Sequence, residues 1–541
     1  MELQFIFRNE QDGRECPAGE LEYCFPGREF VLSGEPCHFR CRFGYFYPLP
    51  FITILGSHKA ETLIAQDPVF DEIELIKEDG EIRVIFLYDT GRMDMEGREP
   101  QVLRIVHERD FRKGFAVYRN WYAELAAQCT DLAGKAARTR DCFYLRRYFF
   151  NRALCSSHIL EADGGVTLSE LFEDDCRQTG GIDAALLFDY AYDPETGIRC
   201  GNAEPFPFGK KTLSALNEQI REIRDNGCGH VFAYFEPYLI ENGSDWDRKM
   251  AEKESGVRSS KIRDNAGRPV MVWGSHQWHP CLMGRNWQQI SLDFLKRVTK
   301  GLDCDGVYLD EYGNETQYVC RSHDHEHGNM PQTMMEQTYL SVLQKGVRPG
   351  LWMSEYPVPY TMADRFDIVL SDTRTLVNAY RFAHPEIRFI RILGTDRPVG
   401  DNVPDLNKSF FNGEGLWIDN NLHDPVWYSC RVKEQMRLQY RLRQKYKWFF
   451  SSLDVMPLYP VQARSVLCNA FFYGGQKLLT LLNPSESVDT VRISLDRGMT
   501  AFDTVQETFL TVMKDAADGD YVTLDLKSWS IGCILLGSGS R

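Results

Sequence analysis

The sequence predicts an α/β protein in which a central (β/α)₈ TIM barrel is flanked by an N-terminal and a C-terminal β-sandwich domain. Three observations lead to this prediction. Short apolar runs alternate with longer amphipathic stretches through the middle of the chain, short β-rich runs stand on either side, and 541 residues suffice for about three domains. The expected domains are residues 1–128, 129–452 and 453–541.

The N-terminal region carries the pattern of antiparallel strands. Its short apolar runs are separated by turn residues, as in a β-sandwich, and lie at 29–32, 51–55, 72–76 and 82–87. Aromatic residues at helical spacing predict a helix at 115–127. The small and polar residues of 131–140 are expected to form a linker into the next domain.

The middle of the chain alternates strand and helix patterns. The predicted strands are 143–150, 184–189, 231–236, 306–310, 351–355, 366–370, 388–392 and 416–419. The clearest helices between them are 212–226, 287–300 and 334–345. A doubly wound open sheet is the alternative, but no Gly-rich phosphate fingerprint follows the first strand, which favours the barrel.

The C-terminal region returns to short strands broken by Pro, Asp and Gly. They are predicted at 466–472, 477–483, 490–494, 521–526 and 531–536, which indicates a small β-sandwich.

Composition excludes several classes of function. With 62 basic and 77 acidic residues, the chain has a net charge of −15 and no basic cluster, so neither nucleic acid nor an anionic membrane is expected as a partner. No apolar run reaches the roughly 18 residues of a membrane span, and no secretory signal pattern opens the sequence. The sixteen cysteines include no CxxC pair. We therefore expect a cytoplasmic protein with reduced thiols.

Acidic and aromatic residues follow several predicted strands. In a barrel, the carboxyl ends of the strands form the functional face. One acid there could simply cap a helix, but acids at five strand ends favour a site for a polyhydroxylated ligand, because carboxylates accept hydrogen bonds from hydroxyls. Among these strand-end residues, we expect substrate binding from Asp189, Tyr190, Glu236 and Asp419.

Two of these acids suit catalysis. Adjacent residues of a strand face opposite ways, and we expect Asp310 to face the cleft while Glu311 begins the loop. Glu355 ends the next strand. Glycoside hydrolysis needs one ionised carboxylate and one carboxyl group that holds a proton. The alternatives are that Asp310 only braces its loop and that Glu355 forms a buried ion pair, for example with Arg374.

A histidine-rich segment, CRSHDHEHG at 320–328, follows Asp310 in the predicted loop above the site. We expect His323, His325 and His327 to contact substrate hydroxyls. A divalent metal site is the alternative, since histidine is the commonest metal ligand, and solvated loop residues are a third. No metal or other cofactor is expected.

Trp287 stands in an aromatic-rich stretch before the strand of Asp310. Its ring is expected to stack on a sugar, with core packing as the alternative. Motifs of other enzyme classes are missing from the sequence: there is no GxSxG, Walker A or HExxH.

The order CLMGRNWQQ, DGVYLDEYG, CRSHDHEHG and LWMSEYP resembles the DUF6259-type glycoside-hydrolase-like barrels. More distantly it is similar to the barrels of endo-α-N-acetylgalactosaminidases and α-N-acetylgalactosaminidases. The resemblance covers mainly residues 140–430. It implies that Asp310 is the nucleophile at the end of the fourth strand, that Glu355 is the acid/base at the end of the fifth, and that the mechanism is retaining.

These observations together predict a glycosidase that acts on an α-linked oligosaccharide or glycoside. Two alternatives stay open: a non-catalytic carbohydrate-binding barrel, and a metal-dependent hydrolase or isomerase that uses the histidines of 323–327. The identity of the sugar and the oligomeric state do not follow from the sequence.

Overall fold

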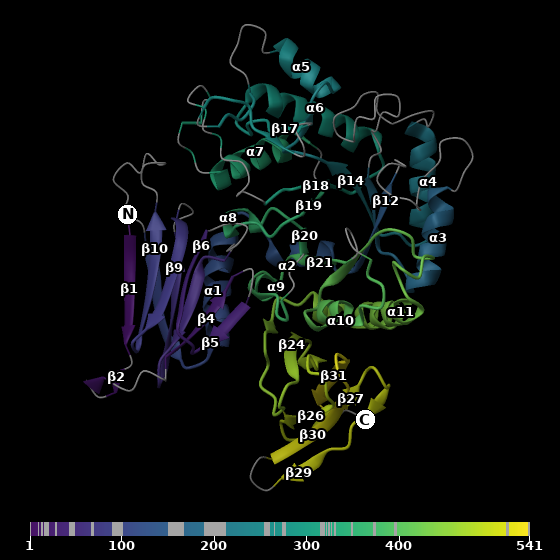
Figure 1. The fold of residues 1–541 in the computed structure, drawn as a ribbon. Helices are drawn as coiled ribbons and strands as arrows, with labels where there is room; N and C mark the ends of the chain where they lie inside the picture. The colour runs from purple at the N-terminus through teal and green to yellow at the C-terminus, as the bar shows by residue number, and fades with distance from the viewer. Residues whose placement is uncertain are drawn as a thin grey trace.

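The computed structural model confirms the predicted fold class, with a closed eight-stranded barrel between two β-rich regions (Figure 1). The residues that the structure describes are 2–8, 10–11, 14–15, 21–27, 30–42, 49–66, 70–88, 101–149, 167–188, 213–253, 260–264, 266–272, 277–313, 320, 322, 325, 327–328, 330, 332–347, 350–371, 375–393, 398–515 and 519–538. Within these residues, no helix is both long and apolar enough to cross a membrane.

The N-terminal region contains two antiparallel sheets. One has the strand order β1 (Glu2–Arg8), β10 (Glu81–Tyr88), β9 (Phe70–Glu78) and β6 (Cys37–Arg42). The other has the order β11 (Val102–Glu108), β8 (Lys59–Ala65), β7 (Phe51–Leu55), β4 (Glu22–Pro26) and β5 (Phe30–Ser33). Aromatic side chains join the sheets: the rings of Phe25 and Phe39 lie 4.7 Å apart. A short hairpin, β2 (Glu10–Gln11) and β3 (Arg14–Glu15), extends from this region.

Helix α1 (Phe111–Ala126) joins the N-terminal sheets to the barrel. It approaches the sheet closely at Gly114, where a Cβ atom would lie only 2.0 Å from Oγ1 of Thr53. On its other side, the hydroxyl of Tyr118 pairs with Nε2 of His384 at 2.9 Å. The buried side chains of both regions form one continuous hydrophobic core.

The segment expected to be a linker is largely helical. Helix α2 (Leu132–Arg138) begins at Asp131, whose side chain accepts a hydrogen bond from the backbone N–H of Gly134. Lys135 is fully buried and donates a 2.5 Å hydrogen bond to the carbonyl oxygen of Ala363. The segment does connect the two regions, as predicted, but it does so as a helix that packs against the barrel.

Each of the eight predicted barrel strands is present, and each pairs in parallel with its neighbours. In barrel order they are β12 (Tyr144–Phe149), β13 (Ala184–Phe188), β14 (His230–Phe235), β18 (Gly306–Leu309), β19 (Leu351–Ser354), β20 (Ile368–Ser371), β21 (Arg388–Ile392) and β22 (Gly415–Ile418). The last strand pairs with the first through Leu416 and Tyr144. The barrel is thus closed, and its strand ends share one face.

Helices follow the strands in the sequence. They are α3 (Leu168–Thr179), α4 (Leu213–Asp225), α6 (Arg285–Gly301), α7 (Gln332–Gly346), α8 (Tyr360–Ala363), α9 (Ala379–Ala383), α10 (Val403–Phe411), α11 (Cys430–Lys445) and α12 (Lys447–Phe450). Between β14 and α6 the chain makes an excursion through β15 (Ile240–Glu241), α5 (Asp245–Lys253), β16 (Met271–Val272) and β17 (Gln277–Trp278). This excursion lies after the end of the third barrel strand, near the functional face.

Aspartates stabilise the opposite end of the barrel. Asp183, Asp305 and Asp367 each precede a strand and accept a hydrogen bond from a backbone N–H at the start of the preceding strand in the barrel. For Asp183 the bonds come from Phe143 and Tyr144, at 2.9 and 2.8 Å. Acids at this end of a barrel contribute to stability rather than to chemistry.

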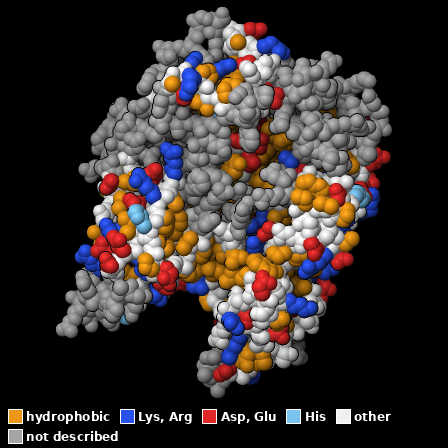
Figure 2. Space-filling view, in the orientation of Figure 1, with side chains coloured by type: hydrophobic (Ala, Val, Ile, Leu, Met, Phe, Trp, Pro, Cys, Tyr) orange, Lys and Arg blue, Asp and Glu red, His pale blue; other side chains and the backbone are white. Residues whose placement is uncertain are grey.

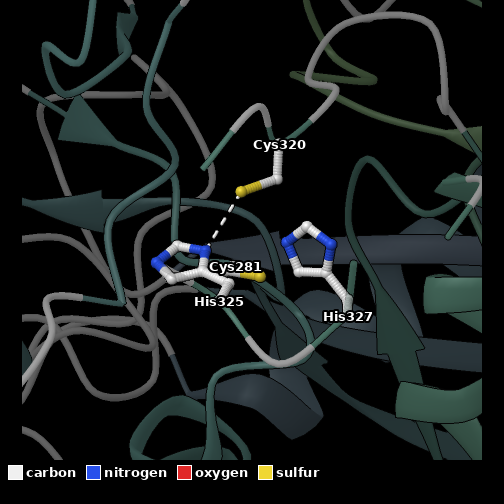
Figure 3. Close-up of side chains that lie close together, drawn as sticks. All are labelled: Cys281, Cys320, His325 and His327. Carbon is white, nitrogen blue, oxygen red and sulfur yellow. Dashed lines mark hydrogen bonds between the residues drawn. The ribbon is translucent and has the colours of Figure 1, made fainter. Parts of the chain in front are cut away.

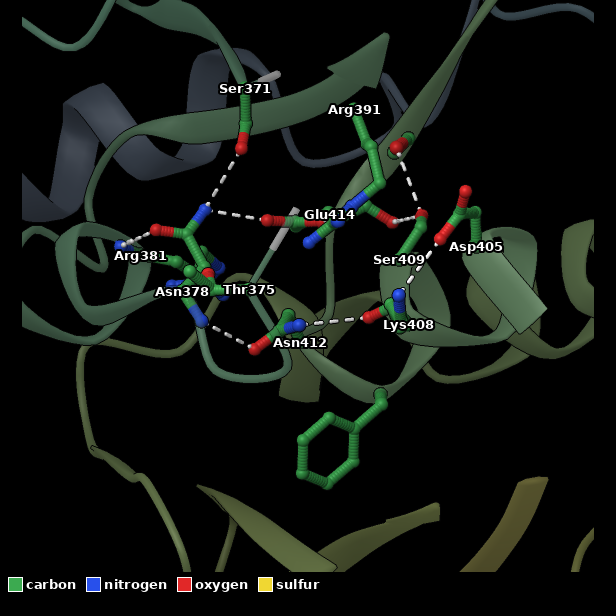
Figure 4. Close-up of polar contacts among 12 residues, drawn as sticks. Ser371, Thr375, Asn378, Arg381, Arg391, Asp405, Lys408, Ser409, Asn412 and Glu414 are labelled. Carbon is green, nitrogen blue, oxygen red and sulfur yellow. Dashed lines mark hydrogen bonds and ion pairs between the residues drawn. The ribbon is translucent and has the colours of Figure 1, made fainter. Parts of the chain in front are cut away.

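Buried polar groups join the sixth, seventh and eighth barrel strands (Figure 4). Glu414 accepts hydrogen bonds from Arg391 at 2.6 Å and from Asn378 at 2.5 Å. Asn378 also donates to the hydroxyl of Ser371 at 3.3 Å. Because the carboxylate is fully buried, its pairing with Arg391 offsets the cost of removing its charge from water.

The C-terminal region has its own hydrophobic core. Its larger sheet has the order β23 (Val455–Met456), β24 (Leu467–Tyr473), β25 (Gln476–Leu482), β31 (Ile531–Ser538), β27 (Met499–Asp503) and β28 (Thr508–Phe509). The smaller sheet has the order β26 (Asp489–Leu495), β30 (Gly519–Leu526) and β29 (Met513–Asp515). Asn469 and Thr480 both donate hydrogen bonds to the carbonyl oxygen of Phe411 at the end of α10, which attaches the sheet to the barrel.

Candidate active site

Asp310 lies directly after β18 and faces the barrel interior. Tyr308 and Asp310 share a face of the strand, and the Tyr308 hydroxyl donates a 2.8 Å hydrogen bond to Oδ1 of Asp310. The hydroxyl of Tyr234, on the neighbouring strand β14, donates to Oδ2 at the same distance. Two phenols thus hold both oxygens of one carboxyl group. Figure 2 shows acidic side chains in a hollow on the barrel face.

Glu355 follows β19, the next strand of the barrel. Its Oε2 accepts a 2.6 Å hydrogen bond from the backbone N–H of Glu311. Glu311 has a φ of 55°, in the left-handed region, so the chain turns sharply after Asp310 and presents this N–H to the neighbouring strand. This bond ties Glu355 to the residue that follows Asp310, so the two acids lie at neighbouring strand ends.

Glu236 adds a third carboxyl group, from the end of β14. It is buried, with its Oε1 accepting a 2.8 Å hydrogen bond from the backbone N–H of Tyr238. The hydroxyl of Tyr234 lies 3.4 Å from its other oxygen, so Tyr234 contacts both Glu236 and Asp310. The sequence-predicted acids of the third, fourth and fifth strands therefore meet in one cluster.

Three acids of the cluster have raised pKa values. Burial, followed by the charges of Asp310 and Glu311, raises the pKa of both Glu236 and Glu355 well above the usual range of a glutamate. Burial and the charge of Asp310 raise the pKa of Glu311 to about 7. The protonated forms of Glu236 and Glu355 are therefore favoured. A carboxyl group with a raised pKa can act as a general acid.

An aromatic wall continues from these acids around the barrel interior. The rings of Phe188 and Tyr234 lie 4.0 Å apart, and those of Tyr308 and Trp417 lie 5.7 Å apart. The guanidinium group of Arg147 lies 5.0 Å from the Phe188 ring and 5.3 Å from the Trp417 ring. Aromatic faces beside carboxyl groups suit the mixed apolar and hydroxylated surface of a sugar.

Asp419 lies at the end of β22, where the sequence places it, but it does not offer a free carboxylate. It is fully buried, forms an ion pair with Arg147, and accepts hydrogen bonds from Nε1 of Trp417 and the N–H of Asn420. Because these groups occupy its oxygens, Asp419 orients Arg147. The expectation that it contacts substrate directly is corrected accordingly.

The prediction that Trp287 stacks on a sugar is wrong. Its side chain is fully buried, and Nε1 donates a 3.1 Å hydrogen bond to the carbonyl oxygen of Pro237. The ring packs against Phe235 and Trp246. Phe235 lies on the outer side of β14, where side chains meet the helix layer, and Trp287 at the start of α6 fills that layer.

The remaining predicted residues divide into two groups. Asp189, Tyr190 and His323 lie outside the described residues. The structure brings His325 and His327 together with the thiols of Cys281 and Cys320. This group of four contains no carboxylate.

Sequence reasoning missed four residues of the site: Tyr234, Tyr308, Glu311 and Arg147. A signal existed for the two tyrosines, because each lies two residues before a strand-end acid and so shares its face. The sequence held no signal for Glu311 or Arg147. Glu311 depends on a left-handed backbone, and Arg147 depends on Asp419, which is 272 residues away in the sequence although its strand is the barrel neighbour of β12.

No protein-family model and no curated protein sequence matches this chain. Solved structures do match its fold. A GH36 α-galactosidase from Geobacillus stearothermophilus in complex with 1-deoxygalactonojirimycin matches with a TM-score of 0.64 at 11% identity, over 99% of this chain and 76% of that one. The galactosidase domain of an α-galactosidase–sucrose kinase matches with a TM-score of 0.62 at 11% identity, over 98% and 74%.

A second kind of enzyme shares part of the fold. The α-amylase of Geobacillus thermoleovorans, solved with acarbose, matches with a TM-score of 0.51 at 12% identity, over 74% of this chain and 99% of that one. At these identities the comparisons show the architecture: a TIM barrel with β-rich flanking domains, as in glycoside hydrolases. The more specific resemblance to DUF6259-type barrels is not among their findings.

Proposed function

We propose that this protein is a retaining glycoside hydrolase that acts on an α-linked glycoside. One observation carries the proposal: Asp310, held at both oxygens by tyrosine hydroxyls, lies on the strand next to that of Glu355, whose pKa is raised well above its usual range by burial and by the charges of Asp310 and Glu311. An ionised carboxylate beside a protonated one is the pair that glycosidic cleavage requires.

Asp310 and Glu355 each act in both steps of the proposed reaction. In the first, an oxygen of Asp310 forms a bond to the anomeric carbon, while Glu355 transfers its proton to the departing glycosidic oxygen. In the second, Glu355 takes a proton from water, whose oxygen attacks the anomeric carbon and releases Asp310. The hydroxyls of Tyr234 and Tyr308 orient the attacking carboxylate throughout.

The backbone link between the two acids supports retention. An inverting pair stands about 6.5–9.5 Å apart to leave room for a water molecule, whereas a retaining pair stands about 5–5.5 Å apart. Asp310 and Glu355 end neighbouring strands, and the N–H of Glu311, the residue after Asp310, donates a hydrogen bond to Glu355. This link favours the closer spacing of a retaining pair.

The likeness to solved structures supports an α-linked substrate. The matching α-galactosidase has been solved with stachyose and with raffinose, and the matching α-amylase with acarbose. We therefore propose an oligosaccharide or glycoside with an α-linked terminal sugar, and α-galactosides are the first candidates.

Nitrophenyl α- and β-glycosides, compared side by side, test this proposal. We expect turnover of an α-glycoside, first formation of the α-anomer in NMR spectra, and loss of turnover in Asp310→Asn. Saturable binding of the sugars with no turnover of any glycoside would instead indicate a carbohydrate-binding barrel. First formation of the β-anomer would overturn the retaining mechanism.

A further inference from the structure

Four side chains that could ligate a metal ion converge beside the barrel face (Figure 3). They are Cys281, Cys320, His325 and His327, and one ligand atom from each lies within 4.8 Å of all the others. Sγ of Cys320 and Nδ1 of His325 are already 3.1 Å apart. In a tetrahedral zinc site, Zn–S distances of about 2.3 Å and Zn–N distances of about 2.1 Å separate the ligand atoms by roughly 3.3–3.8 Å.

The orientation of His327 is that of a metal ligand. Its Nδ1 lies 2.8 Å from the carbonyl oxygen of Gly328, and since a carbonyl can only accept, Nδ1 carries the hydrogen. Nε2 therefore has a free lone pair, and this buried atom has no hydrogen-bond partner in the structure. A ligating histidine characteristically donates its other ring N–H to a carbonyl or carboxylate in this way.

The backbone at Cys281 is held by two hydrogen bonds. Its N–H donates a 2.7 Å hydrogen bond to the carbonyl oxygen of Ser260, and its carbonyl oxygen accepts one of 2.8 Å from the N–H of Gly284. Cys281 and Cys320 are both buried, as the ligands of a structural metal site are.

We propose that Cys281, Cys320, His325 and His327 form a structural zinc site. Two sulfurs and two imidazoles are the ligands of closed tetrahedral zinc sites, whereas calcium and magnesium require oxygen ligands. All four positions would be filled by protein atoms, which leaves none for a water molecule or substrate. The ion would therefore hold structure rather than act in catalysis, and this inference does not depend on the proposed glycosidase activity.

The connectivity shows what such an ion would hold. Cys281 belongs to the excursion between β14 and α6, while the other three ligands belong to the connection between β18 and α7, which begins at Asp310. Zinc would thus join the loops that follow the third and fourth barrel strands. These two strands also end in Glu236 and Asp310, so the ion would fix the loops beside the carboxyl cluster.

The full-length protein, purified without chelator or a histidine tag, tests this site. We expect about one zinc ion per chain by elemental analysis, from the four-ligand stoichiometry of a single site. Replacement by cobalt should produce the visible absorption bands of tetrahedral cobalt with thiolate ligands. Cys320→Ser and His327→Ala should each lose most of the metal, while Cys430→Ser and His423→Ala, outside the cluster, should retain it.

Several results would overturn the proposal. One is a wild-type protein that takes up no zinc when zinc is supplied. Another is an undiminished zinc content in both ligand variants. A third is a disulfide between Cys281 and Cys320, found by peptide mapping of the protein from a cell extract prepared under reducing conditions. If the ligand variants fail to fold, zinc release from the wild-type protein still tests the site. A thiol-blocking mercurial must then release one equivalent of zinc to a colorimetric chelator, and no release rejects the site.

Discussion

The backbone N–H of Glu311 donates a 2.6 Å hydrogen bond to Oε2 of Glu355, which ties the turn after the fourth barrel strand to the acid that ends the fifth. The residue next to the proposed nucleophile thus positions the proposed acid. The contact requires the left-handed conformation of Glu311, a backbone region in which non-glycine residues are uncommon. Such local strain is retained where the surrounding structure demands it, often at functional sites.

Glu355→Gln should separate substrates by their leaving groups. Without an acid, hydrolysis of a natural glycoside should fall by about 10²–10⁴-fold, while a nitrophenyl glycoside, whose leaving group needs little protonation, should lose far less. Asp310→Asn should lose both activities. Steady-state kinetics on paired substrates measures the difference.

Asp372 provides the matched comparison for that experiment. It directly follows Ser371, the last residue of β20, and lies outside the described residues. If Asp372→Asn shows the leaving-group dependence and Glu355→Gln does not, the general acid belongs to the sixth strand rather than the fifth.

Glu311→Gln should shift the pH dependence of activity. Burial, Asp310 and then Glu311 raise the pKa of Glu355, and activity is lost as pH rises through that pKa. Removing the charge of Glu311 removes one cause of the raised pKa of Glu355, so the alkaline limb of the kcat/KM profile should move to lower pH. An alkaline limb that stays at the same pH or moves to higher pH would contradict electrostatic coupling between Glu311 and Glu355.

The same variant should alter how stability depends on pH. Glu311 has a folded-state pKa of about 7, above its ordinary value, so its contribution to stability is present below about pH 4.5 and is lost as pH rises through about 7. The wild type should therefore lose stability relative to Glu311→Gln between these pH values. Thermal unfolding at pH 5 and pH 8 compares the two proteins, and parallel curves would refute the prediction.

Tyr308→Phe and Tyr234→Phe should each reduce kcat/KM by about 10–150-fold, because each removes a hydrogen bond to the proposed nucleophile, and a hydrogen bond to a charged group is worth about 1.5–3 kcal/mol. Tyr144→Phe is the control, since that buried hydroxyl donates to the carbonyl oxygen of Met436, away from the acids. Equal losses of activity in all three variants would indicate a general effect on the fold.

Asp175→Asn should destabilise the barrel by about 3–5 kcal/mol, since it leaves the buried guanidinium of Arg146 without its charged partner. The two side chains are fully buried and pair at 2.8 Å. In contrast, Asp496→Asn should cause no measurable change, because Asp496 is 73% exposed and lies 3.5 Å from Lys477. Urea unfolding measures both variants.

Much of the barrel follows from local pattern. The runs that end at Asp310 and Glu355 predicted β18 and β19 to within one residue, because a buried parallel strand must be continuously apolar and a polar residue ends it. Trp287 shows the limit of such reasoning. A tryptophan beside a predicted site has the same sequence signal whether it faces a ligand or the helix layer, and only the packing of α6 against Phe235 places it in the core.

By itself, the sequence determined the order of β-rich region, barrel and β-rich region, and it placed Glu236, Asp310 and Glu355 at the ends of consecutive barrel strands. Hydrophobic periodicity is a local property, and it suffices for both results. Only the tertiary structure gathered those acids into one cluster and brought Cys281 to Cys320, His325 and His327. Contacts between distant segments arise from barrel closure and loop packing, which no local pattern records.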